Sequence, residues 1–582
     1  MNLNTIVYQS RYSSSAHTRT LTLSLTVLGI LSVLLFCIPI FHAWQLYPYS
    51  FQNSTASYSA LSGIFPWSDA NGYYDGAYQL LDKGLINAWN SRRPLNVSLL
   101  ATRLWLSNFN LQMALIIQAV LCGLSAFSAS AMVANSFGEK AGFLTFGVLF
   151  LFIHNFLPTT LSEPLGLTLG CVAFTFLWDA AQRKNISSLF LGALTLMCAL
   201  NARAGAFLVL PLLGIWVLFQ FATSFPKRSN YLALLIFILG LAFGVFCNIL
   251  LSWLYTDGSG AAHSNFSLTL FGVVLGGKGW TYAYDLYPDI SKLSESQLSE
   301  FLYHKCFTHF LDEPTLVFVG LWKNFLKIFK HSLVFFWQGL PDSALLRALL
   351  RLVGAFALIH LCLQFKRHYN QHKPFFTLLL AGMMGMFLSA LIILQDGGSR
   401  VFAATVPFLA ATIGVTVSLY LRKQTARGTL EPSKLPLNIS YVLTVLLLSA
   451  GLFAPILIHK THSDFHPSVI CPVGYEPILV KDLAIAPQLA LPMDAELYKQ
   501  NVVNSTVEYK DNFLNVLARS TPSNPSRLSL VYNAIKQETQ YIFGPEELFA
   551  HPPKWSCLCG KVMPTEDKTS FISEVIKGTP YE

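Results

Sequence analysis

The sequence predicts an all-α polytopic membrane protein of about eleven transmembrane helices, with loops on its outer face and a small C-terminal extramembrane domain of α+β or irregular structure. Three observations predict this fold class: the composition, the recurrence of long apolar stretches, and the distribution of basic residues. Of the 582 residues, 53% are hydrophobic and only 12% are charged, whereas soluble globular proteins carry about 25% charged residues. This composition excludes a soluble enzyme and a disordered, collagen-like or coiled-coil chain. The net charge of +9 is typical of cytoplasmic loops that face anionic lipid, so we expect no nucleic-acid partner.

Apolar stretches of spanning length recur along the chain. A transmembrane helix needs about 20 mostly apolar residues. The first stretch is too long for a removable signal peptide and lacks a small-residue cleavage site, so we interpret it as an anchor. The predicted spans lie at 21–44, 111–133, 141–157, 164–181, 187–200, 204–222, 230–255, 345–365, 374–394, 401–421 and 437–458.

Basic residues predict the orientation of these spans. If residues 1–20 lie in the cytoplasm, the short outer turns hold only two basic residues, Arg203 and Arg400. This bias obeys the positive-inside rule, and an odd number of spans places the C-terminal tail outside. The basic residues of the predicted inner segments are Arg11, Arg19, Lys140, Arg183, Lys184, Lys227, Arg228, Lys366, Arg367, Lys373, Arg422, Lys423, Arg427 and Lys434.

Three large segments are predicted on the outer side of a membrane domain that spans residues 21–458. They are the loop 45–110, the loop 256–343 and the tail 459–582, whose polarity and Pro, Asn and Ser content favour a small folded domain. Cys306, Cys471, Cys557 and Cys559 fall in these segments. Because disulfides persist outside the cytosol, we expect Cys471 to pair with Cys557 or Cys559.

Two acidic residues stand at the predicted starts of outer-face helices. Asp69 precedes a helical spacing of Tyr73, Ala77, Leu80 and Leu81, which predicts a short helix along the membrane surface. Glu163 precedes Pro164 at the mouth of an apolar span. Either acid has a structural alternative as a helix cap. Acids so close to lipid are unfavourable unless they face a wet cavity, which favours a functional role.

Arg203 and Arg400 are the two basic residues that depart from the positive-inside pattern. Each lies beside an apolar stretch on the predicted outer side. A snorkelling side chain is the structural alternative for Arg203. Anion binding accounts for both residues, because a guanidinium group matches phosphate oxygens in a bidentate manner.

The second outer segment contains two further features. Lys323, Lys327 and Lys330 fall on one face of a helix predicted within 314–337, which is typical of an interfacial helix on the outer leaflet. This helix either anchors the segment to the membrane or recognises a lipid carrier. The run from Gly276 to Trp280 includes Lys278 and is either a plain flexible connection or a mobile loop that closes over a substrate.

Taken together, these features resemble the GT-C superfamily of integral-membrane glycosyltransferases. The similarity covers about residues 20–420 and is greatest to the group of aminoarabinose transferases and protein O-mannosyltransferases. It rests on an acid ahead of a surface helix in the first outer loop (Asp69, Tyr73, Ala77) and on the turn Ser162-Glu163-Pro164. It also rests on an arginine between two short apolar segments (Arg203) and on a late span that opens with Arg400 and continues to Pro407-Phe408-Leu409.

The resemblance implies a reaction. The donor is a polyprenyl-phosphate-linked sugar, and the acceptor is an unknown glycan, lipid or protein. It implies an active site on the periplasmic side of a bacterial plasma membrane. The residues alone do not distinguish this membrane from that of an endoplasmic reticulum. Asp69 is the expected catalytic base for an inverting displacement. Arg203 and Arg400 would stabilise the departing phosphate.

The resemblance also suggests residues that support this chemistry. Arg93 and Lys278 are candidate helpers at the phosphate, and Tyr73 is a candidate substrate-binding residue. Glu163 would orient the acceptor or the donor sugar. Some branches of the superfamily need a divalent metal, which Asp69, Asp75 and Glu163 would hold, but we favour a single base without a metal or another cofactor.

Two other classes of function remain open from the sequence. A lipid or sugar transporter also carries charges at membrane depth, but it usually shows paired repeats with broken helices, which we do not find. A non-catalytic membrane scaffold that binds partners through its tail is the second alternative. Replacement of Asp69 by Asn separates the classes, because it is silent in a scaffold and abolishes transfer in a glycosyltransferase.

Overall fold

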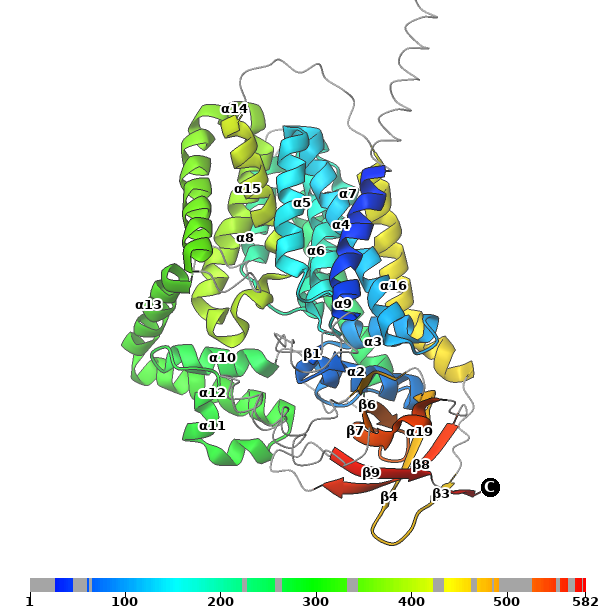
Figure 1. The fold of residues 1–582 in the computed structure, drawn as a ribbon. Helices are drawn as coiled ribbons and strands as arrows, with labels where there is room; N and C mark the ends of the chain where they lie inside the picture. The colour runs from blue at the N-terminus through cyan, green and yellow to red at the C-terminus, as the bar shows by residue number, and fades with distance from the viewer. Residues whose placement is uncertain are drawn as a thin grey trace, which may run out of the picture.

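The structure is a computed structural model. It describes residues 27–44, 60–61, 65–221, 228–256, 264–331, 344–421, 434–461, 468–483, 486–490, 526–550, 555–563, 571–577 and 579–581. A helical bundle forms one end of the molecule, and the outer-loop helices and the C-terminal sheet lie together at its other end (Figure 1).

The bundle consists of helices that follow the apolar stretches. They are Val27–Trp44, α4 (Leu111–Phe137), α5 (Glu139–Ile153), α6 (Glu163–Arg183), α7 (Ile186–Ala202), α8 (Val209–Phe221), α9 (Arg228–Tyr255), α14 (Ala344–Gly397), α15 (Val406–Leu421) and α16 (Leu435–Thr461). Helix α14 joins two helices across a kink at His372. Helix α6 is buried along its whole apolar window and forms the centre of the bundle.

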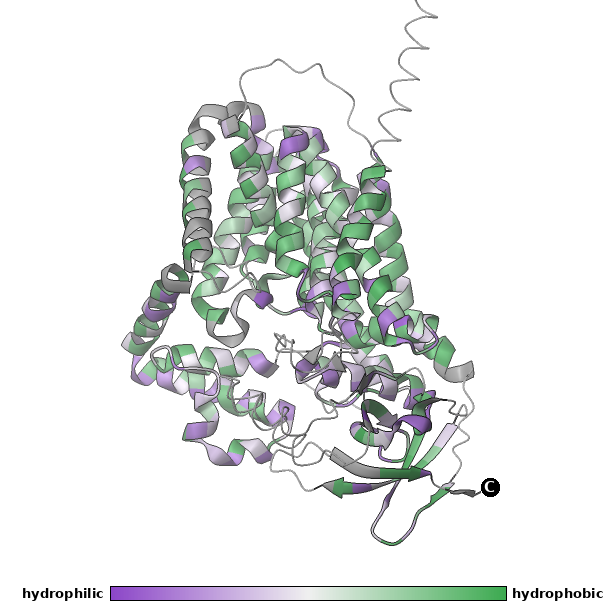
Figure 2. Cartoon of the chain, in the orientation of Figure 1, coloured by the Kyte–Doolittle hydropathy of each residue, from purple (hydrophilic) through white to green (hydrophobic). Residues whose placement is uncertain are grey.

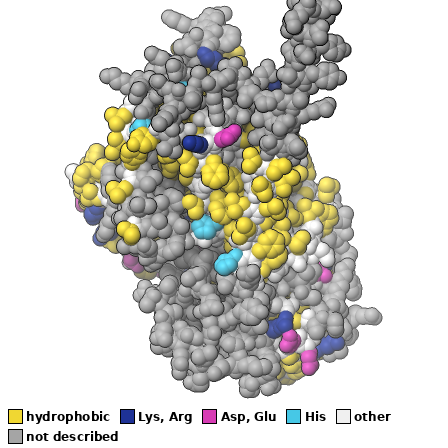
Figure 3. All heavy atoms as spheres, turned by 45° about the horizontal axis from the view of Figure 1, so that its top comes forward, with side chains coloured by type: hydrophobic (Ala, Val, Ile, Leu, Met, Phe, Trp, Pro, Cys, Tyr) yellow, Lys and Arg dark blue, Asp and Glu magenta, His cyan; other side chains and the backbone are white. Residues whose placement is uncertain are grey.

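In the part of the chain that the structure describes, six helices are long and apolar enough to cross a membrane. They are Val27–Trp44, Leu111–Phe137, Glu163–Arg183, Asn230–Tyr255, His372–Leu394 and Leu435–Ile458. The predicted spans 141–157, 187–200, 204–222 and 401–421 fall on α5, α7, α8 and α15, and the span 345–365 falls on the part of α14 before its kink. None of these is among the six, so the count of about eleven stays a prediction. Hydrophobic residues dominate the bundle (Figure 2), and hydrophobic side chains gather across the middle of the face shown in Figure 3, as in a multi-pass membrane protein.

The first outer loop folds into helices packed under the bundle. Helix α2 (Asp69–Lys83) is followed by the 3₁₀ helix η2 (Asn90–Arg92) and by α3 (Pro94–Leu106). Gly72 and Gly76 of α2 let this helix approach Trp89 and Asn90, because a Cβ atom at either glycine would overlap those side chains. The short strands β1 (Ala60–Leu61) and β2 (Phe65–Pro66) precede α2.

The second outer segment forms a separate helical unit. It contains α10 (Ser264–Val274), α11 (Tyr282–Leu286), η3 (Pro288–Lys292), α12 (Glu295–Asp312) and α13 (Pro314–His331). Helix α13 lies where the sequence predicts a surface helix. Its Asn324 Nδ2 donates to the Leu391 carbonyl of α14 at 2.7 Å, which attaches the unit to the end of that span.

The tail folds into a six-stranded sheet with strand order β4-β8-β9-β7-β6-β5. All neighbouring strands are antiparallel except β7 and β9, and the pair Val480–Asn533 also links β4 to β6, so that the sheet curls. Cys471 forms a disulfide with Cys559, one of the two predicted partners. The strands are β4 (Glu476–Lys481), β5 (Gln488–Ala490), β6 (Ser526–Asn533), β7 (Glu538–Pro545), β8 (Trp555–Met563) and β9 (Phe571–Lys577), beside the pair β3 (Ser468–Ile470) and β10 (Thr579–Tyr581) and the short helix α19 (Glu546–Ala550).

Candidate active site

Two helices begin with the two predicted acids. Asp69 is the first residue of α2, and Glu163 is the first residue of α6. The residues in the N-cap positions are Ser68 and Ser162, so neither acid is the capping residue itself. Both carboxylates therefore enter the site from helix N-termini, where the helix dipole favours negative charge.

Arg400 connects the two acids. Its Nη2 atom lies 3.0 Å from Asp69 Oδ2, and its Nε atom lies 3.7 Å from Glu163 Oε1. Arg203 Nε approaches the same Glu163 oxygen at 3.2 Å. Four charged side chains from four distant segments thus form one continuous chain of ion pairs.

The two acids differ in how far their side chains are buried. The Glu163 side chain is 1% exposed and Arg203 is 4% exposed, whereas Asp69 is 36% exposed. A buried ion pair needs its partner to compensate for the loss of water, which makes Glu163 and Arg203 mutually dependent. Of the two carboxylates, Asp69 is therefore the one that a bound molecule can reach.

Tyr73 and Arg93 extend this cluster along one side of α2. Arg93 Nη1 donates to the Tyr73 hydroxyl and to Ser162 Oγ, the latter at 3.1 Å. Its guanidinium group also lies 5.9 Å from the centroid of the Tyr73 ring. The structure therefore brings Asp69, Tyr73, Arg93, Glu163, Arg203 and Arg400 together.

The charges in the cluster shift one another's pKa values. Burial disfavours the charged form of Arg400, but Glu163 and Asp69 outweigh this effect and raise its pKa. Burial lowers the pKa of Arg203 to about 10, although Glu163 opposes the shift. Both guanidinium groups therefore remain positively charged at neutral pH.

Two glycines allow close packing around the segments that carry Arg203 and Arg400. A Cβ atom at Gly205 would overlap the Val401 carbonyl oxygen, and one at Gly170 would overlap the Ala404 carbonyl oxygen. Arg203 follows α7, and Arg400 lies in the 3₁₀ helix η4 (Gly398–Phe402). Close backbone contact at these glycines brings η4 against the loop after α7 and brings the residues that follow η4 against α6.

A pocket beside the ion pairs is lined by three arginines and by apolar side chains. Its basic side is formed by Arg92, Arg93 and Arg203. The remaining lining residues are Ala204, Gly205, Phe207, Ser264, Asn265, Phe266, Ile393 and Val401. Guanidinium groups next to an apolar wall suit an anion that carries a hydrocarbon chain.

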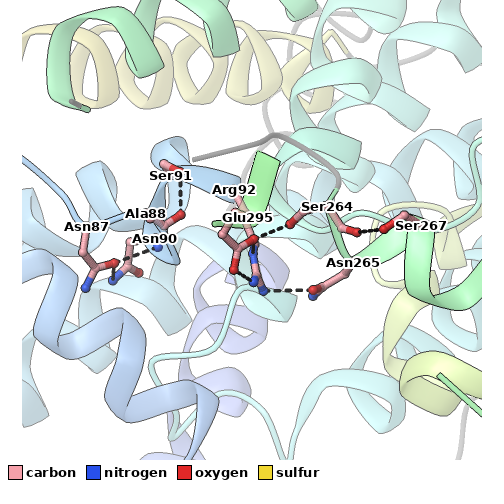
Figure 4. Close-up of polar contacts among 9 residues, drawn as sticks. All are labelled: Asn87, Ala88, Asn90, Ser91, Arg92, Ser264, Asn265, Ser267 and Glu295. Atoms are coloured by element: carbon pink, nitrogen blue, oxygen red, sulfur yellow. Dashed lines mark hydrogen bonds and ion pairs between the residues drawn. The ribbon is translucent and has the colours of Figure 1, made fainter. Parts of the chain in front are cut away.

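Arg92 is held in this pocket by the second outer segment (Figure 4). Its Nε atom donates to Glu295 Oε2 at 2.7 Å, and its Nη1 atom donates to Asn265 Oδ1 at 2.9 Å. Ser264 Oγ donates to the same Glu295 oxygen at 2.6 Å. Arg92, Asn265 and Glu295 were not predicted from the sequence, where the basic pair Arg92-Arg93 is the local signal for this contact.

Lys278 lies elsewhere in the second outer segment. Its Nζ atom stands 5.1 Å from the centroid of the Tyr282 ring, and its side chain is exposed. It is not among the residues that line the arginine pocket.

Asp75 faces away from Asp69 and Glu163. Its Oδ1 atom accepts a hydrogen bond from the backbone of Thr539 in the tail at 2.9 Å. The three carboxylates considered as metal ligands therefore do not converge. Among the described residues, no group of three or more His, Cys, Asp or Glu side chains has the arrangement of a metal site.

Comparisons with known proteins add two distant structural similarities. The chain matches no protein-family model, and no curated protein matches its sequence. The oligosaccharyltransferase of Archaeoglobus fulgidus in complex with zinc and sulfate is 10% identical over 84% of this chain, with a TM-score of 0.34. Its apo form is 11% identical over 74% of this chain, with a TM-score of 0.39. The chain spans only 58% and 56% of the length of those two chains.

Proposed function

We propose that this protein is a membrane glycosyltransferase that moves a sugar from a polyprenyl-phosphate carrier to an acceptor by an inverting displacement. The observation that carries the proposal is the meeting of Asp69, Glu163, Arg203 and Arg400 in one chain of ion pairs beside an arginine-lined pocket. A partly exposed carboxylate next to fixed cations is the arrangement that this displacement needs.

The arginine pocket supports a lipid-phosphate donor. Arg93 and Arg203 would bind the phosphate oxygens, and Phe207, Phe266 and Ile393 would contact the first carbons of the lipid chain. The surrounding contacts hold these arginines in position before the phosphate binds. They can therefore take the place of the water that hydrates a free phosphate.

In the proposed step, the acceptor hydroxyl attacks the anomeric carbon of the sugar. The new C–O bond forms as the bond between that carbon and the phosphate oxygen breaks, and Asp69 takes the hydroxyl proton. The electron pair of the broken bond stays on the polyprenyl phosphate. Arg203 and Arg400 stabilise this growing charge, and attack from the opposite face inverts the anomeric centre.

The pairing of Arg400 with Asp69 suggests how donor binding prepares the base. A phosphate that approaches Arg400 competes with Asp69 for the same guanidinium group, whose Nη2 atom lies 3.0 Å from the carboxylate. A carboxylate that is no longer paired with a cation is free to accept a hydrogen bond from the acceptor hydroxyl. The donor would therefore release Asp69 for proton transfer only when the leaving group is in place.

Glu163 would orient a sugar hydroxyl. Its Oε1 atom approaches both arginines, while Oε2 is buried and has no hydrogen-bond partner among the described residues. A buried carboxylate oxygen without a donor is unfavourable, and a sugar hydroxyl would satisfy it. The positive-inside bias supports a site on the non-cytoplasmic side of the membrane; we propose the periplasmic face of a bacterial plasma membrane.

The test uses purified full-length protein with undecaprenyl-phosphate-linked mannose, glucose and aminoarabinose as donors and an envelope lipid extract as acceptor. Release of undecaprenyl phosphate is measured for the wild type and for Asp69→Asn, with Arg527→Ala in the tail as control. We expect release by the wild type and by the control, and a loss of about 100-fold or more in Asp69→Asn. Equal release by Asp69→Asn, or no release by the wild type with any donor, would overturn the proposal.

Binding of the carrier itself gives a second measurement that needs no acceptor. Undecaprenyl phosphate should bind the wild type in a titration of tryptophan fluorescence, and the neutral alcohol undecaprenol should bind at least about tenfold more weakly, because a charged contact contributes about 1.5–3 kcal/mol. Arg93→Gln should remove this preference. Equal affinity for the phosphate and the alcohol would contradict the assignment of the pocket.

A further inference from the structure

The hairpin β6–β7 of the tail lies against one face of α2, the helix that begins at Asp69. The side chains of α2 that form hydrogen bonds with it are Asn71, Asp75, Gln79 and Asp82. Their spacing of three to four residues puts them on a single face of the helix. The hairpin follows α2 by more than 440 residues in the sequence, so only the tertiary structure brings the two together.

Four hydrogen bonds join the hairpin to this face. Thr539 donates from its backbone nitrogen to Asp75 Oδ1 at 2.9 Å and from its hydroxyl to Asn71 Oδ1 at 3.3 Å. Gln79 Nε2 donates to the Gln537 carbonyl at 2.9 Å. The Tyr532 hydroxyl donates to Asp82 Oδ2 at 3.1 Å, near the other end of the helix.

Aromatic contacts extend the interface at both ends. Tyr532 stacks on Tyr78 with ring centroids 5.4 Å apart. Tyr541 donates from its hydroxyl to the Pro66 carbonyl at 3.3 Å, and its ring lies 6.0 Å from that of Trp67. Pro66 and Trp67 directly precede the start of α2, so Tyr541 supports the segment that leads to Asp69.

Other parts of the site hold α2 from further directions. Asn90 Nδ2 donates to the Gly72 carbonyl at 2.9 Å, and the Thr160 hydroxyl donates to the Ala70 carbonyl at 2.5 Å. Thr160 lies in the turn that leads to Glu163. The first turn of α2 is thus held between the tail on one side and the two outer turns on the others.

We propose that the C-terminal sheet domain positions the catalytic base, with Tyr532, Thr539 and Tyr541 as positioning residues that act on Asp69 through α2. This inference rests on the proposed function of Asp69. The hairpin touches the helix and the strand before it, so it would set the distance from the Asp69 carboxylate to the sugar without contacting a substrate. A displacement of about 1 Å at a reacting group lowers the rate by about 100-fold.

The test compares the full-length variants Tyr532→Phe, Thr539→Val and Tyr541→Phe, singly and combined, with Arg527→Ala. Each of the three removes one hydroxyl that bonds to α2 or to Pro66 and keeps the shape of its side chain. Arg527 lies on β6 as well, but it pairs with Glu546 at the surface. The matched control therefore changes the same strand without changing the contact with α2.

Turnover of the undecaprenyl-phosphate sugars should show a lower kcat and an unchanged KM for the donor. We expect the combined variant to lose about 10- to 100-fold in kcat, with a KM within about twofold of the wild type, because positioning the base does not bind the donor. A rise in KM at constant kcat, or a kcat equal to that of Arg527→Ala, would overturn the proposal.

Hydrogen exchange of the amides in residues 69–83 provides a measurement that does not depend on activity. The combined variant should exchange faster in this segment than the wild type and the control, because local opening reports the loss of these contacts. If the combined variant does not fold, the single variants, each lacking one bond, should show intermediate exchange and kcat. Unchanged exchange in all variants would overturn the positioning role.

The two proposals fail in distinguishable ways. If Asp69→Asn is inactive while the hairpin variants match the control in both kcat and exchange, the positioning role is wrong and the proposed function stands. If Asp69→Asn is fully active, the proposed function is wrong and the positioning role falls with it. Faster exchange in the hairpin variants would then report only the contact between the tail and α2.

Discussion

At the scale of single residues, Glu163 shows how strongly the site depends on paired charges. It lies 1% exposed between Arg203 and Arg400. Its removal would leave Arg203 buried without its nearest compensating charge. Removing one partner of a buried pair is destabilising by about 3–5 kcal/mol, whereas replacing both partners by apolar groups is often neutral.

A double-mutant cycle on this pair tests that dependence. We expect Glu163→Gln and Arg203→Met each to lower the melting temperature, and the double variant to recover much of the loss. Transfer activity should stay low in all three, because Arg203 contributes to the proposed phosphate site and Glu163 to the proposed orientation of a sugar hydroxyl. Additive losses of stability would show that the two side chains do not compensate each other.

Asp75 is the second residue whose charge state has a measurable consequence. Burial raises its pKa to about 7, the nearby Glu538 adds to this shift, and the hydrogen bond from Thr539 opposes it. An unfolded aspartate titrates near pH 3.9, so the folded protein binds the proton more tightly between about pH 4 and pH 7. The free energy of unfolding should therefore fall as the pH rises through this range and become level above it.

Melting temperatures at pH 5 and pH 8 test this expectation. The wild type should lose stability on going to pH 8, and Asp75→Asn, which cannot ionise, should lose less. The same pH dependence in both proteins would assign the effect to other groups. This measurement concerns the contact between α2 and the tail, not the chemistry at Asp69.

At the scale of elements, the approach of the segment after η4 to α6 depends on Gly170. A Cβ atom there would overlap the Ala404 carbonyl oxygen, whereas a Cβ atom at Gly147 of α5 has nothing within 4 Å. We expect Gly170→Ala to lower stability by about 1–3 kcal/mol and to reduce transfer, because it moves the segment that carries Arg400. Gly147→Ala is the matched helical control, and equal effects of the two substitutions would contradict the packing argument.

At the scale of the whole molecule, a disulfide stabilises the domain that faces α2. Cys471 and Cys559 are 88 residues apart, and a crosslink over so long a loop stabilises by about 2–5 kcal/mol. We expect the double variant Cys471→Ser/Cys559→Ser to lower the unfolding temperature of the tail. Cys557→Ser is the control, because Cys557 is free. If transfer activity falls together with tail stability, the tail and the site are coupled as proposed above.

Composition, apolar periodicity and loop charge were sufficient to predict a helical membrane protein and a folded tail. They also singled out Asp69, Glu163, Arg203 and Arg400, whose roles in a site stay a proposal. These features are local, because a span needs its apolar length and an outer arginine stands out against the positive-inside pattern. Cys471 was likewise expected to pair with Cys557 or Cys559, and the structure forms the second of these pairs.

Only the tertiary structure decided which of these residues meet. It places Arg93 and Arg92 at the pocket while Lys278 lies over Tyr282, and it joins the tail hairpin to α2. Contacts such as Arg92–Glu295 and Thr539–Asp75 link segments 203 and 464 residues apart. Such pairings leave no periodic trace in the sequence, because they arise from the packing of whole helices and strands rather than from the preference of any one segment.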